Sequence, residues 1–161
     1  MKHNVIAVYK RHDNAVAAIH ELTDQHLPAR KIGILSKLNT DDELELKSAG
    51  KAATGLAIGG IAGPVLGVLT GIGLFAIPGL GFLFGAGALV GAIAGLDFGL
   101  IGGGVLSALL LNGENQEIAS IYEQLLHDGN TLVVFKGNEE ENRKAYAVLE
   151  KLGTAEQINA H

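Results

Sequence analysis

The pattern of apolar and polar positions changes twice along the chain, and these changes separate two flanks from a centre. In the first flank, the short apolar runs NVIAVY at 4–9 and KIGILS at 31–36 predict two strands. Between them the spacing of apolar residues predicts a helix over 14–26, capped by Asp13 and stopped by Pro28. The apolar positions that keep the helical period are Ala15, Ala18, Ile19 and Leu22.

The second flank has the same alternation of helices and strands. A helix is expected over 115–127, a strand over 130–135, an amphipathic helix over 139–153 and a short last strand at EQINA, 156–160. Gly129 and Gly153 are expected to end the two helices in the left-handed conformation. The expected buried stripe of the first helix is Ile118, Ile121, Tyr122 and Leu125, and that of the second is Ala145, Val148, Leu149 and Leu152.

Without the centre, the order of elements is β-α-β followed by β-α-β, which predicts an α+β fold with the ferredoxin-like split arrangement. Residues 1–40 would form the first half of this domain, and 41–51 a charged connector. Residues 52–111 would form an insertion, and 112–161 a helix and the second half.

The centre contains two apolar stretches, 52–75 and 82–111, on either side of AIPGLG at 76–81. As helices they would be about 36 and 45 Å long, at 1.5 Å per residue. Each exceeds the roughly 20 residues that a bilayer core requires. The pattern predicts a helical hairpin, and its expected turn residues are Pro78, Gly79 and Gly81.

Glycine recurs at every fourth position in both stretches, although it costs roughly 1 kcal/mol in a helix interior relative to alanine. Residues four apart lie on nearly the same helix face, so each series would form a groove for close helix packing. We predict that these glycines pack the arms on each other or on other copies of the chain. They are Gly55, Gly59, Gly63, Gly67 and Gly71 in the first stretch, and Gly87, Gly91, Gly95, Gly99 and Gly103 in the second.

The distribution of charged residues supports the same division into two flanks and a centre. The 45 residues 52–96 contain no Asp, Glu, Lys or Arg, and 18 of the 23 glycines fall within 52–113. Asp97 lies near the middle of the second stretch. An acid at membrane depth suggests an ion or proton path; the alternatives are a cap on a broken helix, or an acid that faces water inside a soluble oligomer.

Composition and motifs exclude several functions. The net charge of −5 gives no basic footprint for nucleic acid, and the absence of cysteine excludes disulfides and thiol chemistry. GIGLFA at 71–76 fits a dinucleotide fingerprint, but no expected strand precedes it. We therefore expect neither an enzyme nor a cofactor.

Small clusters of polar residues suggest little more chemistry. His12, His20 and His26 could cluster loosely, but their spacing predicts no metal site. A small anion could bind at the start of the first helix, near a group of basic residues that would be solvated otherwise. These residues are Lys10, Arg11, Arg30 and Lys31.

Several segments together carry a family resemblance that covers nearly the whole chain. The opening VIAVY…AVAAIHEL…KIGILS leads to a glycine-rich centre with IPGLG at its turn, then to IYEQLLHDGNTLVVF and AYAVLEKLG. The chain resembles the general stress protein and low-temperature-induced protein family of small bacterial proteins. The resemblance implies a role in a stress response and association with a membrane, and it carries no catalytic residues.

Three functional hypotheses follow. The first is a non-enzymatic stress protein on the cytoplasmic side of the inner membrane, where the glycine hairpin contacts lipid and drives homo-oligomerisation. The second is a water-soluble homo-oligomeric shell in the cytoplasm, with the hairpins packed in a shared core. The third is a module that senses a small anion, whose identity the residues do not define.

Overall fold

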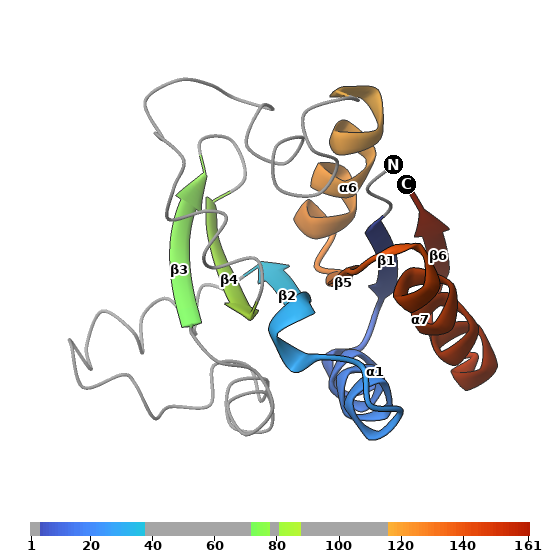
Figure 1. Ribbon diagram of the computed structural model, residues 1–161. Coiled ribbons are helices and arrows are strands. Elements are labelled where there is room, and N and C mark those ends of the chain that lie inside the picture. Colours follow the sequence, from blue (N-terminus) through green and yellow to red (C-terminus); the bar gives the residue numbers. More distant parts are fainter. Residues whose placement is uncertain (1–3, 38–71, 78–80, 88–115) are drawn as a thin grey trace.

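The strands in the described part of the chain form one antiparallel sheet of six strands in the order β3-β4-β2-β5-β1-β6 (Figure 1). The computed structural model describes residues 4–37, 72–77, 81–87 and 116–161. The strands are β1 (Asn4–Tyr9), β2 (Ile32–Lys37), β3 (Ile72–Ile77), β4 (Gly81–Gly87), β5 (Thr131–Lys136) and β6 (Gln157–Ala160). The α-helices in these ranges are α1 (His12–Asp24), α6 (Gln116–His127) and α7 (Glu139–Leu152), and a 3₁₀ turn, η1, covers Ala29–Lys31. The prediction of an α+β fold is confirmed.

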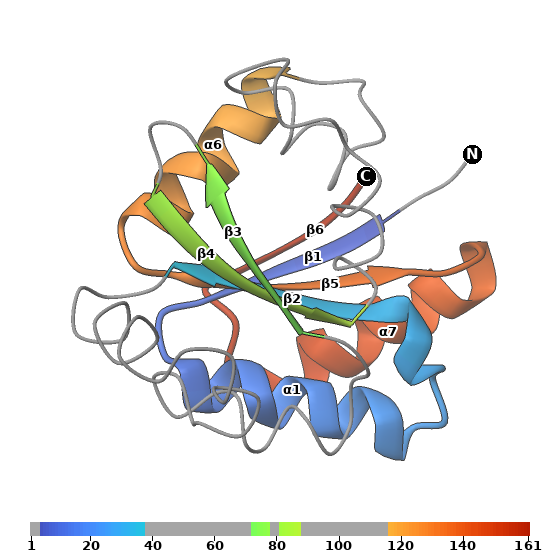
Figure 2. The same ribbon diagram turned by 90° about the vertical axis from the view of Figure 1, so that its left-hand side faces the viewer.

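The helices lie on both faces of the sheet (Figure 2). Helices α1 and α7 cover one face, where their apolar residues pack with alternate residues of β1 and β5 such as Val5, Ala7 and Phe135. Helix α6 lies on the opposite face. The residues that alternate with the first set, such as Ile6 and Val134, are also completely buried. Strands β1 and β5 therefore consist of continuous apolar runs, because both of their faces are covered.

The first predicted helix forms, but it begins and ends two residues earlier than expected, and Asp13 is not its cap. Helix α1 begins at His12, its N-cap is Arg11 without a side-chain cap bond, and Asp13 lies inside the first turn. An acid there still interacts favourably with the helix dipole. The helix ends at Asp24, four residues before Pro28.

A left-handed histidine explains this earlier end. His26 has φ 64°, its N–H donates to the Thr23 carbonyl, and the N–H of Leu27 donates to the Leu22 carbonyl. This is a Schellman motif, which usually places glycine at the left-handed position. Both leucines are buried in the core, so their contact fixes the turn.

The second flank confirms the predicted elements but not the predicted stripe of its first helix. Helix α6 buries Ala119, Tyr122 and Leu126 almost completely, whereas Ile121 is 55% exposed. The helix is therefore rotated about its axis relative to the expected orientation. In α7, Ala145 and Leu149 are buried as predicted, and Gly129 and Gly153 both have positive φ.

The centre of the chain differs from the prediction where the structure describes it. Residues 72–75 and 82–87 were expected to be helical, but they belong to β3 and β4, which pair in register from Ile72↔Ala86 to Ile77↔Gly81. Strand β4 also pairs with β2, so this hairpin extends the sheet of the flanks. Three of the five phenylalanines of the chain lie within 72–87, and aromatic residues favour extended backbone next to an available strand edge.

Most of the predicted packing glycines, two of the three predicted turn residues and Asp97 lie outside the described residues. These are Gly55, Gly59, Gly63, Gly67, Gly71, Gly91, Gly95, Gly99, Gly103, Pro78, Gly79 and Asp97. Two others, Gly81 and Gly87, are the first and last residues of β4. Within 4–37, 72–77, 81–87 and 116–161, no helix combines the length and apolar content that crossing a bilayer requires.

Two matched substitutions test the orientation of α6 about its axis. Leu126→Ala should lower the free energy of unfolding by about 2–4 kcal/mol, because it leaves a cavity under a fully buried side chain. Ile121→Ala on the same helix should change it by less than about 0.5 kcal/mol. Urea unfolding followed by circular dichroism measures both, and a larger cost for Ile121→Ala would contradict this orientation.

Candidate functional site

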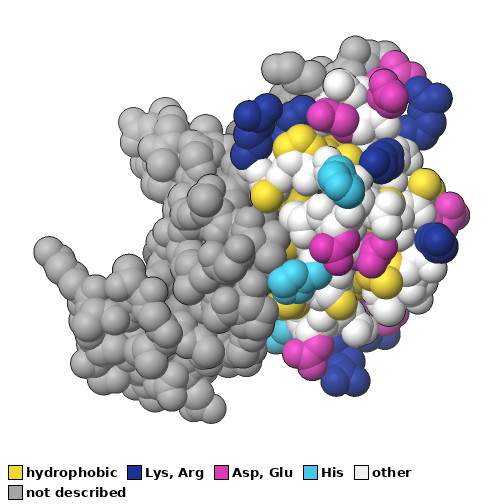
Figure 3. All heavy atoms as spheres, turned by 60° about the horizontal axis from the view of Figure 1, so that its bottom comes forward, with side chains coloured by type: hydrophobic (Ala, Val, Ile, Leu, Met, Phe, Trp, Pro, Cys, Tyr) yellow, Lys and Arg dark blue, Asp and Glu magenta, His cyan; other side chains and the backbone are white. Residues whose placement is uncertain are grey.

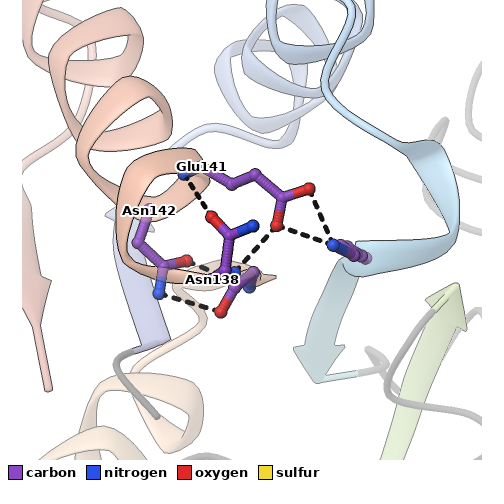
Figure 4. A network of polar contacts seen from close by, with 5 residues as sticks. Asn138, Glu141 and Asn142 are labelled. Carbon is purple, nitrogen blue, oxygen red and sulfur yellow. Dashed lines mark hydrogen bonds and ion pairs between the residues drawn. The ribbon is translucent and has the colours of Figure 1, made fainter. Parts of the chain in front are cut away.

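A network of polar contacts surrounds the start of α7, and we call it the α7 cap network: Lys31, Gly137, Asn138, Glu141 and Asn142 (Figure 4). Asn138 caps the helix, because its side-chain Oδ1 accepts the N–H of Glu141 at 2.9 Å. The Glu141 Oε2 accepts the N–H of Asn138 in return, at 2.8 Å. These reciprocal bonds are a capping box, and they satisfy two backbone donors that the helix leaves unpaired.

Glu141 also joins the two flanks of the chain. Lys31, from η1, donates to its two carboxylate oxygens at 2.7 and 2.6 Å. The two side chains are 28% and 24% exposed, respectively. The Lys31 hydrogen bond, and then the bond from the Asn138 backbone, lower the pKa of Glu141 below its ordinary value.

Gly137 is the tightest position of the network. Its N–H donates to Asn142 Oδ1 at 3.0 Å, and its carbonyl accepts from Asn142 Nδ2 at 3.2 Å. A Cβ at Gly137 would lie 2.5 Å from Phe135 Cε1 and 2.8 Å from Glu141 Cβ. Only glycine therefore allows the strand to turn into α7 this closely.

A second cluster lies at the opposite end of β5, under the start of α1. His12 Nδ1 contacts Thr131 Oγ1, and Thr131 Oγ1 donates to Ser36 Oγ at 3.2 Å. Thr131 and Ser36 are at most 1% exposed. Tyr9 is buried in the core on this face, its hydroxyl has no hydrogen-bond partner among the described residues, and burial raises its pKa. Because Thr131 separates the imidazole from a buried serine, this arrangement does not activate Ser36 as a nucleophile.

A third cluster connects α6 with β6. Tyr122 Oη lies 2.9 Å from His161 Nε2 and accepts from Asn159 Nδ2 at 3.0 Å. The two rings meet edge to face, with centroids 6.0 Å apart. Burial lowers the pKa of His161 and raises that of Tyr122, so both groups stay neutral near pH 7. The cluster holds α6 to the edge of the sheet.

The predicted basic cluster does not form. Lys10 follows the end of β1, where Tyr9 lies opposite Thr131, whereas Lys31 precedes the start of β2, where Ile32 lies opposite Phe135. Lys10–Arg11 and Arg30–Lys31 therefore lie at opposite ends of the sheet, roughly 13 Å apart along β5.

Three of these four basic side chains also have acidic partners. Lys31 pairs with Glu141, Lys10 pairs with Glu156 at 3.1 Å, and Arg11 pairs with Asp13 at 3.4 Å. Over the face that carries α1, acidic and basic side chains are interspersed (Figure 3). The described surface thus offers no concentrated positive charge to an anion at the start of α1.

The described residues contain hollows but no group of acidic and histidine side chains arranged to hold a metal ion. One hollow of about 380 Å³ lies between α1 and α7, lined by residues that include Glu21, Gln25, Lys144 and Lys151. The Lys144 ammonium reaches across and donates to the Gln25 carbonyl at 2.7 Å. Lysine stems and a backbone contact therefore occupy the rim of this groove.

The sequence pattern predicted the helix over 139–153, but it did not reveal the α7 cap network. The Asn138-x-x-Glu141 spacing is a capping-box signal and could have been identified. The contact between Lys31 and Glu141 joins residues 110 positions apart, so no local pattern indicates it.

No protein-family model matches this chain, and neither a curated protein nor a solved structure shows significant similarity to it.

The charge of Glu141 should make stability depend on pH. Because its folded pKa is lowered, it stabilises the fold above its ordinary pKa, and this contribution is lost as the pH falls through the folded value. Glu141→Gln keeps a side chain that can complete the capping box but removes the charge. The variant should lose less stability than the native chain upon acidification, as measured by urea midpoints between pH 7 and pH 3, and parallel curves would contradict this.

Gly137→Ala should lower the free energy of unfolding by about 1–3 kcal/mol, because the added methyl overlaps atoms of Phe135 and Glu141. The control is Arg143→Ala, also on α7. The Arg143 side chain is 76% exposed, and its ion pair with Glu139 is long, at 3.9 Å. This substitution should cost less than about 0.5 kcal/mol. Thermal unfolding compares the two variants, and equal losses would mean that Gly137 is not tightly packed.

Proposed function

We propose that this protein is a non-enzymatic, self-associating protein in which an α+β domain presents a glycine-rich insertion whose only charged residue is Asp97. The observation that carries this proposal is the position of the insertion in the fold. Strands β2 and β5 are direct neighbours, paired from Ile32↔Phe135 to Ser36↔Thr131, yet the whole centre of the chain lies between them in sequence. The fold therefore places the two strands that flank the centre in sequence, β2 and β5, side by side.

The strand order supports a ferredoxin-like classification of this domain. Strand β5 lies between β1 and β2, and β1 lies between β5 and β6. Each β-α-β unit thus leaves room for one strand of the other unit, which is the defining feature of the split arrangement. We propose this classification for β1, α1, β2, β5, α7 and β6.

The sheet also bears on the choice between self-association and a membrane anchor. Strands β2, β3 and β4 share one sheet, so they lie on the same side of any membrane. A segment that leaves β2 and returns to β3 would have to cross a bilayer twice, which takes about 40 residues. Residues 38–71 number 34, and this count favours packing between copies of the chain over a spanning hairpin.

A membrane-associated stress protein on the cytoplasmic side of the inner membrane is the second candidate. The 45 residues without charge fit this candidate as well as the first, because lipid and a shared protein core select for the same apolar composition. Under either candidate, the resemblance to the general stress protein family leads us to propose a stress response as the setting.

Substitutions in the glycine series test self-association directly. Gly63→Leu and Gly95→Leu should reduce the mass of the purified full chain, measured by light scattering after gel filtration, because each fills the proposed packing groove. Ala62→Leu and Ala94→Leu add similar volume beside the series, and Gly63→Ala keeps the position small. These three controls should assemble like the native chain.

Two outcomes would contradict the proposal or select the second candidate. A monomeric native chain would overturn self-association. Recovery of the chain only from detergent-treated membranes would favour the anchor over an assembly in which copies cover one another.

A further inference from the structure

We infer that β3 is an interaction surface through which two copies of this chain pair edge to edge. The inference rests on the proposed self-association and names the strand that mediates it. Within the described ranges, β3 has β4 on one side only, and it is the outermost strand of the sheet (Figure 1). Alternate residues of such a strand direct their N–H and C=O groups away from the sheet, where they can pair with another strand.

The two edges of the sheet differ in chemistry. Strand β6 at the opposite edge has four residues, Gln157–Ala160, and two of them carry polar amide side chains. Glu156 directly before it is exposed and pairs with Lys10. Short length and flanking charge are devices that keep an edge strand from pairing with other chains.

Strand β3 carries none of these devices. Its six residues, IGLFAI, contain no charge and no proline, and the nearest charged residues in sequence are Lys51 and Asp97. Short segments rich in branched and aromatic residues, without charge, associate readily as strands. Natural sheets rarely leave such an edge unpaired.

A second copy of the chain is the occupant that this edge fits. Antiparallel pairing about a two-fold axis places the same strand on both sides, so the apolar residues and the outward backbone groups match automatically. A net charge of −5 repels copies elsewhere on the surface, but β3 lies in the charge-free part of the chain. A charged peptide from another protein would find no complementary side chain on this strand.

The geometry predicts a closed dimer. In a strand of six residues, three alternate residues direct both their N–H and their C=O groups outward. Two such strands paired antiparallel can therefore form about six hydrogen bonds between the copies. Because the β6 edge is short and polar, the paired sheets do not continue into a filament. Additional copies would have to join through the glycine-rich insertion.

A spin-label scan tests this pairing on the full chain, which contains no cysteine. Single cysteines at each of the six positions 72–77 are labelled, and the distance between labels in the assembly is measured by pulsed electron resonance. The two-fold pair predicts a V-shaped profile, with a minimum near the axis and a rise of roughly 6.6 Å per residue on each side. The matched control is the same scan at 157–160 in β6, which should give no such minimum.

Mass measurement of every labelled variant makes each outcome decisive. A V-shaped profile at β3, or loss of the dimer only when a label sits near the middle of β3, supports edge pairing. An oligomer without a minimum at β3 overturns this inference and leaves the proposed self-association intact. A monomeric native chain overturns both.

Discussion

The fold depends on β5, a strand that follows the insertion in sequence but lies in the middle of the sheet. It lies between β1 and β2, so the two strands of the first flank join one sheet only when the second flank supplies β5. Its residues Val133 and Phe135 pack in the same core as Val5 and Ile34. Burial of these side chains, at about 25 cal/mol per Å² of apolar surface, is therefore available only when both flanks meet.

The α7 cap network adds a polar connection at the same junction. Glu141 satisfies a backbone donor at the start of α7 and holds the Lys31 ammonium at the start of β2. Both side chains are about one quarter exposed, so each loses part of its hydration, which the paired hydrogen bonds replace. Ion pairs on the open surface, such as Lys10–Glu156, contribute far less because water screens them. The network fixes how the flanks dock, whereas the apolar core supplies most of the stability.

Local patterns predicted the flanks well and their tertiary details less well. The apolar runs at β1, β2 and β5 are long enough to identify strands without any partner. By contrast, the end of α1 depends on His26 adopting a left-handed conformation that is usual for glycine. The orientation of α6 depends on whether Ile121 or Leu126 meets the sheet, and both fit a helical period. The Lys31–Glu141 contact could be seen only in the folded structure, because the two residues are far apart in sequence.

The helical prediction for the centre was wrong, where the structure describes it, for a more general reason. A spacing of four residues is close to one helical turn, but it is also two full periods of a strand, so glycines four apart share a face in either structure. Gly87 belongs to the predicted helical series, yet it lies in β4 opposite Gly33. Gly85 likewise pairs with Gly73. These glycine pairs bring no side chains to pack, whereas Leu74↔Phe84 and Phe75↔Leu83 place large apolar residues opposite one another in β3 and β4. A two-stranded hairpin of large apolar residues without charge requires cover from outside itself, and this requirement connects the composition of the centre to the proposed self-association.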